Sequence, residues 1–143
     1  MDWVGQVLNK PWEWGAKGPD SFDCYGLLYW VKKNFYGQEI PHLDGIGSLN
    51  KFGIRELASI FGSNMDVWEE LEYPIDGCAV ALSQLRVGVH HCGVWTSIDG
   101  GLVIHAEETN RVRAQTIQNL RLHTWRTISF YELKKDGKNN IPI

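Results

Sequence analysis

One cysteine of this sequence stands where a helix is predicted to begin, and it is the strongest candidate for a nucleophile. Cys24 directly follows Asp23, and apolar residues recur after it at the spacing of one helix face. These residues are Leu27, Leu28, Val31 and Phe35. Free backbone N–H groups and the positive dipole end of a first turn favour the reactive thiolate. Gly26 leaves room beside the sulfur for a substrate backbone. A buried structural thiol is the alternative interpretation.

A nucleophilic cysteine needs a base, and two adjacent histidines are candidates. His90 and His91 lie in a segment with strand character, residues 89–95. Side chains alternate along a strand, so the two histidines point to opposite faces and only one of them can meet Cys24. A hydrogen-bonded structural histidine is the alternative for either residue.

His105 is a third candidate, because a Cys–His pair works better when another group fixes the tautomer and orientation of the imidazole. If His105 lies opposite His91 on a neighbouring antiparallel strand, their Cβ atoms are about 5 Å apart. That register opposes Trp95 to Gly101 and leaves a five-residue loop, which is an allowed hairpin length. A two-residue turn at Asp99–Gly100 is the alternative, and it puts His105 on the other face.

The same residues contain the elements of a metal site, which is the weaker interpretation. Zinc would be held by Cys24, His91, Cys92 and His105. Strand alternation points Cys92 away from His91, and no Cys-x-x-Cys pair is present. We therefore expect no metal and no cofactor. Three cysteines are an odd number, so we expect no disulfide scaffold and interpret Cys78 and Cys92 as reduced core thiols.

The pattern of the whole chain predicts an α+β fold, with N-terminal helices packed on a C-terminal antiparallel sheet. Helices are expected over 3–8 with Asp2 as cap, over 24–35 between a Ser21 or Asp23 cap and Gly37, and over 54–61. Strands are expected over 78–82, 89–95, 102–106, 112–117 and 124–131. An ordered loop over 12–22 precedes the cysteine. We expect a single domain over 1–143, with a frayed tail over 134–143.

The composition argues against several classes of partner. The 143 residues are 43% hydrophobic and 22% charged, with a formal net charge of -3 and no basic cluster. Neither nucleic acid nor a membrane is therefore an expected partner. The first residues show neither the basic nor the apolar region of a signal peptide, and no apolar run approaches the ~20 residues that span a bilayer.

Three segments of this chain occur in a recognisable order. The first runs from Pro11-Trp12-Glu13-Trp14-Gly15 to Phe22-Asp23-Cys24-Tyr25-Gly26-Leu27, the second is His91-Cys92-Gly93-Val94-Trp95, and the third is Ile104-His105-Ala106. Pro74-Ile75-Asp76-Gly77 precedes the second. Together they resemble the motifs of the NlpC-type family of cell-wall cysteine peptidases, over about residues 3–112.

The resemblance implies a papain-like fold and hydrolysis of a peptide bond in the peptidoglycan stem peptide, typically between D-glutamate and a diamino acid. Cys24 is then the nucleophile, His91 the general base and His105 the group that orients the imidazole. The backbone N–H of Cys24 helps to hold the oxyanion. Substrate contacts are expected from Trp12, Trp14, Asp23, Tyr25 and Gly26.

Two positions depart from the pattern of the family. The family usually has tyrosine where this chain has Trp12, which offers an indole N–H in place of a hydroxyl. Tyr25 stands where cell-wall remodelling members usually have serine, and an aromatic residue there resembles the phage-tail branch. By this resemblance we expect a protein made in the host cytoplasm and carried in the virion tail with tail-tip proteins. The expected docking residue is one of four tryptophans: Trp3, Trp30, Trp68 or Trp125.

Two other functions fit the same residues. One is an amidase or acyltransferase that uses the same cysteine and histidine. The other is a non-catalytic tail-assembly or docking module. The intact Cys24, His91 and His105 argue against the module, because core packing alone does not require that trio.

Overall fold

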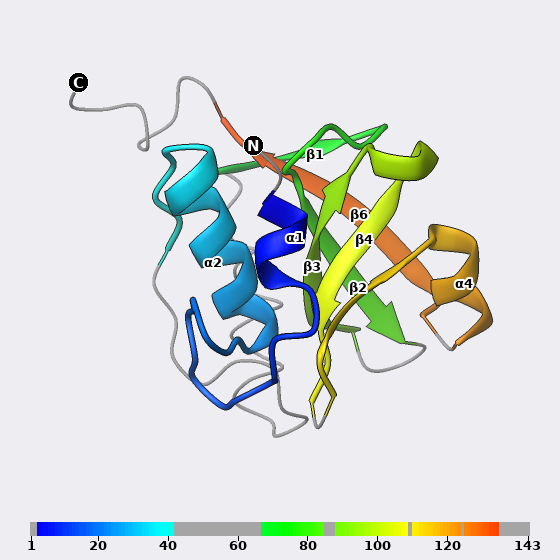
Figure 1. Ribbon diagram of the computed structural model, residues 1–143. Helices are drawn as coiled ribbons and strands as arrows, with labels where there is room; N and C mark the ends of the chain where they lie inside the picture. The colour runs from blue at the N-terminus through cyan, green and yellow to red at the C-terminus, as the bar shows by residue number, and fades with distance from the viewer. Residues whose placement is uncertain (1–2, 42–66, 85–87, 109, 124, 135–143) are drawn as a thin grey trace.

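The computed structural model describes residues 3–41, 67–84, 88–108, 110–123 and 125–134. Within them, a six-stranded antiparallel sheet lies between two N-terminal helices and a short helix late in the chain (Figure 1). Three expectations fall outside the described residues: the Asp2 cap, the helix over 54–61 and the tail beyond residue 134.

The strands follow the order β1-β6-β2-β3-β4-β5, and each neighbouring pair is antiparallel. Their bounds are Trp68–Leu71 (β1), Ala79–Gln84 (β2), Gly88–Thr96 (β3), Leu102–Ala106 (β4), Val112–Gln115 (β5) and Thr127–Leu133 (β6). The helices are α1 (Trp3–Val7), α2 (Cys24–Phe35) and α4 (Ile117–Leu122), with a 3-10 turn, η1 (Ile98–Gly100), between β3 and β4. The predicted α+β layout is confirmed. None of the described helices has the length and apolar character needed to cross a membrane.

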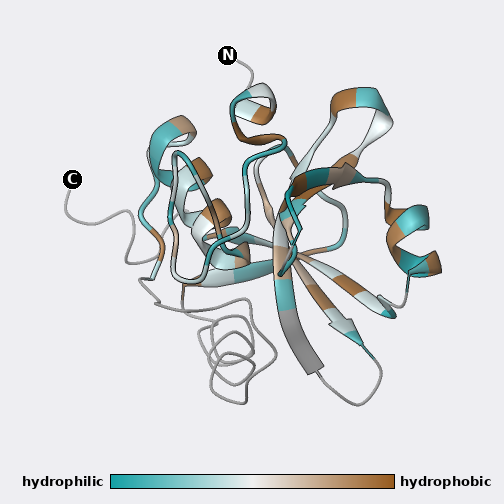
Figure 2. Cartoon of the chain, turned by 60° about the horizontal axis from the view of Figure 1, so that its bottom comes forward, coloured by the Kyte–Doolittle hydropathy of each residue, from teal (hydrophilic) through white to brown (hydrophobic). Residues whose placement is uncertain are grey.

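Side-chain alternation gives the sheet two apolar faces. The first face packs against α1 and α2, and the second packs against Leu120 of α4 and Trp125. Both hydrophobic and hydrophilic residues occur along α2, whereas β2 begins with the apolar residues Ala79 to Leu82, which are buried on both faces (Figure 2). The buried strand residues include Ala79, Ala81, Cys92, Val94 and Ile104 on the first face, and Val80, Leu82 and Val103 on the second.

The start of α2 is held by Asp23, as the sequence predicts. Its Oδ1 accepts the backbone N–H of Gly26 at 2.6 Å, and its Oδ2 accepts that of Gly15 at 3.0 Å. One carboxylate therefore caps the helix and fixes the loop before it. Ser21, the alternative cap, instead donates its hydroxyl to Glu13.

The far end of α2 is anchored to the sheet by an ion pair. Lys32 is fully buried and donates from Nζ to Oε1 of Glu132 in β6 at 2.5 Å. A buried lysine without such a partner would leave an uncompensated charge in the core, so the pair fixes where the helix meets β6. Gly37, with a φ of 63°, follows the last turn and ends the helix as predicted.

The structure contains two elements, β1 and α4, that the sequence does not predict. Residues 68–71 form β1, whose Trp-Glu-Glu-Leu sequence is too short and too charged to show a strand pattern. The strand predicted over 112–117 stops at Gln115, because the hydroxyl of Thr116 caps α4. A helix of six residues is too short to show a helical period. The last strand begins at Thr127, three residues later than predicted.

We predict that Asp23→Ala lowers the free energy of unfolding by about 1–2 kcal/mol, because it removes the cap of α2 and the acceptor for two N–H groups. Urea denaturation followed by circular dichroism measures the change. The matched control is Asp20→Ala, which removes an exposed carboxylate of the same loop. It should change the free energy by less than about 0.5 kcal/mol. Equal losses in both variants would contradict the capping role.

Candidate active site

Cys24 is the first residue of α2, where the sequence predicts a nucleophile. Its side chain is fully buried, and the thiol of Cys92 in β3 is hydrogen-bonded to it. Burial raises the pKa of Cys92 well above its ordinary value, and the hydrogen bond to Cys24 raises it further. Cys92 therefore stays protonated at neutral pH and meets the candidate nucleophile as a thiol.

The space beside Cys24 is occupied by the protein itself. A Cβ atom on Gly26 would lie 1.9 Å from the carbonyl oxygen of Ala16. The room expected for a substrate backbone is therefore filled by the loop before α2, and Gly26 serves the packing of that loop. Tyr25 is 1% exposed and donates its hydroxyl to the carbonyl oxygen of Pro41 at 2.5 Å. This arrangement leaves Tyr25 no surface for a substrate.

Two of the predicted substrate contacts are tryptophans of the loop before α2. Trp14 is 52% exposed. Trp12 is partly buried, and its backbone N–H donates to the carbonyl oxygen of Asn110, which places it beside the β4–β5 connection. Together with Pro11 and residues 110–113, it lines a pocket of about 590 Å³. The indole Nε1 of Trp12 is buried without a hydrogen-bond partner among the described residues.

His91 and His105 meet on the second face of the sheet. Nε2 of His91 lies 2.9 Å from Nδ1 of His105, and the ring planes meet at 77°. Both side chains are buried. The structure therefore brings together the two histidines that the sequence analysis places on one face.

The register that joins the two histidines differs from the predicted one by two residues. Trp95 pairs with Val103, where the sequence analysis expects Gly101. The connection has the predicted five residues, but it runs over 97–101 and so begins one residue later. The two-residue Asp99–Gly100 turn does not form, because these residues belong to η1.

The observed register places Gly93 beside His105. A Cβ atom on Gly93 would lie 2.7 Å from the carbonyl oxygen of Ile104 and 3.0 Å from Cβ of His105. Glycine therefore permits the close approach of β4. The ring of His105 reaches His91 as a diagonal neighbour on the adjacent strand, not as the directly opposed residue.

The ladder between β2 and β3 is irregular directly before His91. Leu82 pairs with His91 and Ser83 pairs with Val89, so residue 90 is an extra residue in β3. Such a bulge bends a strand and re-aims the side chains next to it. The regular alternation expected from residue 89 onward therefore holds only from His91.

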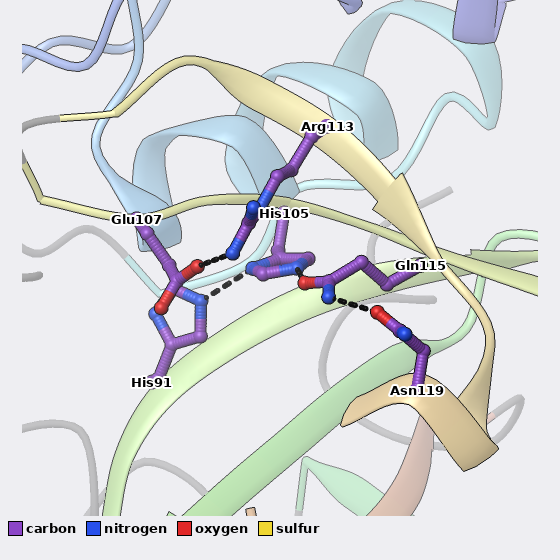
Figure 3. A network of polar contacts seen from close by, with 6 residues as sticks. All are labelled: His91, His105, Glu107, Arg113, Gln115 and Asn119. Atoms are coloured by element: carbon purple, nitrogen blue, oxygen red, sulfur yellow. Dashed lines mark hydrogen bonds and ion pairs between the residues drawn. The ribbon is translucent and has the colours of Figure 1, made fainter. Parts of the chain in front are cut away.

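His105 has a second polar partner that the sequence analysis does not contain. Its Nε2 lies 2.7 Å from Oε1 of Gln115 in β5, and Nε2 of Gln115 donates to Oδ1 of Asn119 in α4 (Figure 3). Burial lowers the pKa of His105, although the bond to Gln115 raises it. Glu107 raises and Arg113 lowers the same pKa, and these two form an ion pair of 2.6 Å beside the ring. His105 is therefore neutral at neutral pH.

The ring of His91 is also stacked on Trp125. The ring centroids are 5.2 Å apart and the planes differ by 19°, which holds the plane of the imidazole. The expectation that Trp125 is an exposed docking residue is therefore wrong. It is also wrong for Trp3 and Trp68, which lie in the core, whereas Trp30 is partly buried against other aromatic rings.

The described residues contain no group of three or more side chains that could hold a metal ion. His91 stacks on Trp125 on the second face of the sheet, whereas Cys92 lies in the core on the first face. The strand alternation that argues against a zinc site is thus observed.

A cysteine that begins a helix, packed on an antiparallel sheet that bears a histidine, is the arrangement of papain-like domains. The model of the NlpC/P60 family matches residues 9–130, which is more than half of the chain. The chain belongs to the NlpC/P60 family. No curated protein sequence matches it.

Solved structures with the same fold include NlpC2 from Trichomonas vaginalis, with a TM-score of 0.62 and 20% identity over 91% of this chain. The match covers 44% of that longer chain. The NlpC/p60 domain of the peptidoglycan hydrolase SagA has a TM-score of 0.55 at 16% identity, covering 89% of this chain and 91% of that one. An N-acetylmuramoyl-L-alanine amidase from Bacteroides uniformis has a TM-score of 0.53 at 14% identity, covering 92% and 97%. These likenesses confirm the papain-like α+β fold.

We predict that iodoacetamide alkylates Cys24 at least about tenfold faster than the other two cysteines at neutral pH. Burial raises the pKa of Cys78 to about 11 and that of Cys92 well above its ordinary value, so both stay thiols. Peptide mass spectrometry over a time course measures the three rates, and urea-unfolded protein is the control in which they should converge. Equal rates in the native protein would count against a reactive thiolate at Cys24.

Proposed function

We propose that the protein is a cysteine endopeptidase that hydrolyses the stem peptide of peptidoglycan between D-glutamate and a diamino acid. The observation that carries the proposal is the helix-start position of Cys24 together with the buried pair of His91 and His105, in a chain of the NlpC/P60 family. A solved NlpC/p60 domain of a peptidoglycan hydrolase supports the substrate class. The bond itself follows from the motif resemblance.

The contact between Cys24 and Cys92 places the start of α2 against β3, one residue along the strand from His91. Cys92 follows His91 in β3, and the bulge in β3 lies directly before this pair of residues. The imidazole of His91 is held by His105 and Trp125 on the second face of the sheet, and its pairing with the sulfur of Cys24 is part of the proposal.

In the proposed reaction, His91 takes the proton of the Cys24 thiol as the sulfur attacks the carbonyl carbon of the scissile bond. His91 then gives that proton to the leaving amine, which departs and leaves a thioester on Cys24. A water molecule, deprotonated by His91, attacks the thioester and releases the carboxylate and the free thiol. The backbone N–H of Cys24 at the helix start stabilises the oxyanion in both steps.

The proposed place of action is the tail tip of a virion. Tyr25 supports it, because an aromatic residue directly after the nucleophile resembles the phage-tail branch of the family. The hydroxyl of Tyr25 ties the segment at Pro41 to the start of α2. Fractionation of the native source tests this part of the proposal: the protein should co-purify with tails, and a protein found only free in the cytosol would contradict it.

An amidase is the second candidate, because a solved structure of the same fold is an N-acetylmuramoyl-L-alanine amidase. Such an enzyme would use Cys24 and His91 in the same two steps on a different bond. The masses of the products separate the two activities, since an amidase releases the intact stem peptide from the sugar.

We predict that the protein cleaves defined muropeptides between D-glutamate and the diamino acid, and that Cys24→Ala abolishes the cleavage because the nucleophile is lost. Liquid chromatography with mass spectrometry identifies the products. The control is Cys78→Ala, which removes a core thiol that has no part in the proposed reaction. Release of the whole stem peptide would indicate the amidase. No product at all from the folded wild type would contradict the enzyme assignment and favour a docking module.

A further inference from the structure

Two amide side chains continue the hydrogen bonds beyond the histidine pair. His91 of β3 contacts His105 of β4, which contacts Gln115 of β5, which donates to Asn119 of α4 (Figure 3). The proposed reaction uses only the two histidines.

The amide oxygen of Gln115 sets the direction of each hydrogen bond in this chain. An amide oxygen only accepts, so Nε2 of His105, 2.7 Å away, must carry a proton. A neutral imidazole has one N–H, so Nδ1 of His105 is an acceptor. Nε2 of His91, 2.9 Å away, must then donate to it. In a neutral His91 the other nitrogen, Nδ1, has no proton and is the basic one.

We propose that Gln115 is a positioning residue that selects the tautomer of both histidines. The inference rests on the proposed function, in which the bare nitrogen of His91 takes the proton of Cys24. With the amide of Gln115 reversed, its NH2 group would donate to Nε2 of His105, and every bond in the chain would reverse. His91 would then present an N–H to Cys24, where the reaction needs a base.

Asn119 keeps the amide of Gln115 in the required orientation. Its Oδ1 accepts from Nε2 of Gln115, and a reversed amide would set two oxygens against each other. The backbone position of Asn119 is fixed by the cap of α4, because its backbone N–H donates to the hydroxyl of Thr116 at 3.0 Å. The ring of His105 is fully buried, so water does not offer it another donor or acceptor.

Nitrogen-15 NMR of labelled histidine reads the tautomers directly and needs no enzyme activity. The experiment uses the full-length Cys24→Ala variant, in which no thiol competes for the proton of His91. At slightly alkaline pH, where an ordinary histidine is neutral, we expect the Nε2–H tautomer for both His91 and His105. An Nδ1–H tautomer at His105 overturns the proposal.

Three substitutions in that background test the role of Gln115. Gln115→Leu should convert the single tautomer into a mixture, whereas Gln115→Glu should retain it, because a carboxylate also only accepts. Gln118→Leu is the matched control, since Gln118 is an exposed glutamine of α4, and it should change nothing. A single Nε2–H tautomer that survives in Gln115→Leu overturns the proposal. If circular dichroism shows that Gln115→Leu is misfolded, the folded Gln115→Glu variant decides instead. Loss of the single tautomer in that variant overturns the proposal.

Activity with Cys24 restored separates this inference from the proposed function. Gln115→Leu should lower kcat for the muropeptide at least about tenfold with little change in KM, and Gln115→Glu should recover most of the loss. If the wild type cleaves no muropeptide while the tautomers respond as expected, the proposed function fails and the role of Gln115 stands. If cleavage occurs but kcat is unchanged in Gln115→Leu, the proposed function stands and the role of Gln115 fails.

Discussion

The hydrogen-bonded chain from His91 through His105 and Gln115 to Asn119 depends on the absence of a side chain at Gly93. The register of β3 and β4 puts this residue beside His105, at a distance where a Cβ atom would lie 2.7 Å from the carbonyl oxygen of Ile104. A larger residue would push β4 away from β3 and separate His105 from His91, which are joined by a contact of 2.9 Å. Gln115 and Asn119 would then lose their hydrogen-bonded connection to His91 as well. The close approach of two backbones is thus the constraint from which the arrangement of the side chains follows.

The parts of the site that leave a local pattern were predictable from the sequence. Cys24 follows a capping residue and opens a helical period, and His91 and His105 keep the same face in any register that differs by two residues. The register itself was not predictable, because a five-residue loop can begin at either of two neighbouring positions. Gln115 and Asn119 were missed because they meet only after Thr116 turns the chain from β5 into α4. The sequence held one signal for Gln115, which is the side-chain alternation of β5. That alternation places the polar Gln115 on the same face of the sheet as His105.

Burial explains why the two histidines of the site are hydrogen-bonded. Cys24 is 0% exposed and His91 is 4% exposed, so their surroundings are poorer in water than the surface of the protein. Electrostatic interactions are stronger in such surroundings, and an unpaired polar atom costs more. The hydrogen bonds accordingly run from His91 through Gln115 to Asn119, and Cys92 faces Cys24 as a protonated thiol. A substrate carbonyl can reach the sulfur only when the residues that cover it move aside.

The central claim is that Cys24 and His91 act as one pair, and the rate of Cys24 alkylation in two histidine variants tests it most directly. His91→Ala removes the proposed base, whereas His90→Ala removes the neighbouring imidazole and is the matched control. Stopped-flow alkylation at slightly acidic pH, with Cys24 identified by peptide mass spectrometry, gives both rate constants. The account predicts that His91→Ala lowers the rate at least about tenfold while His90→Ala leaves it within about twofold of the wild type. An unchanged rate in His91→Ala, or the larger loss in His90→Ala, would contradict the pairing.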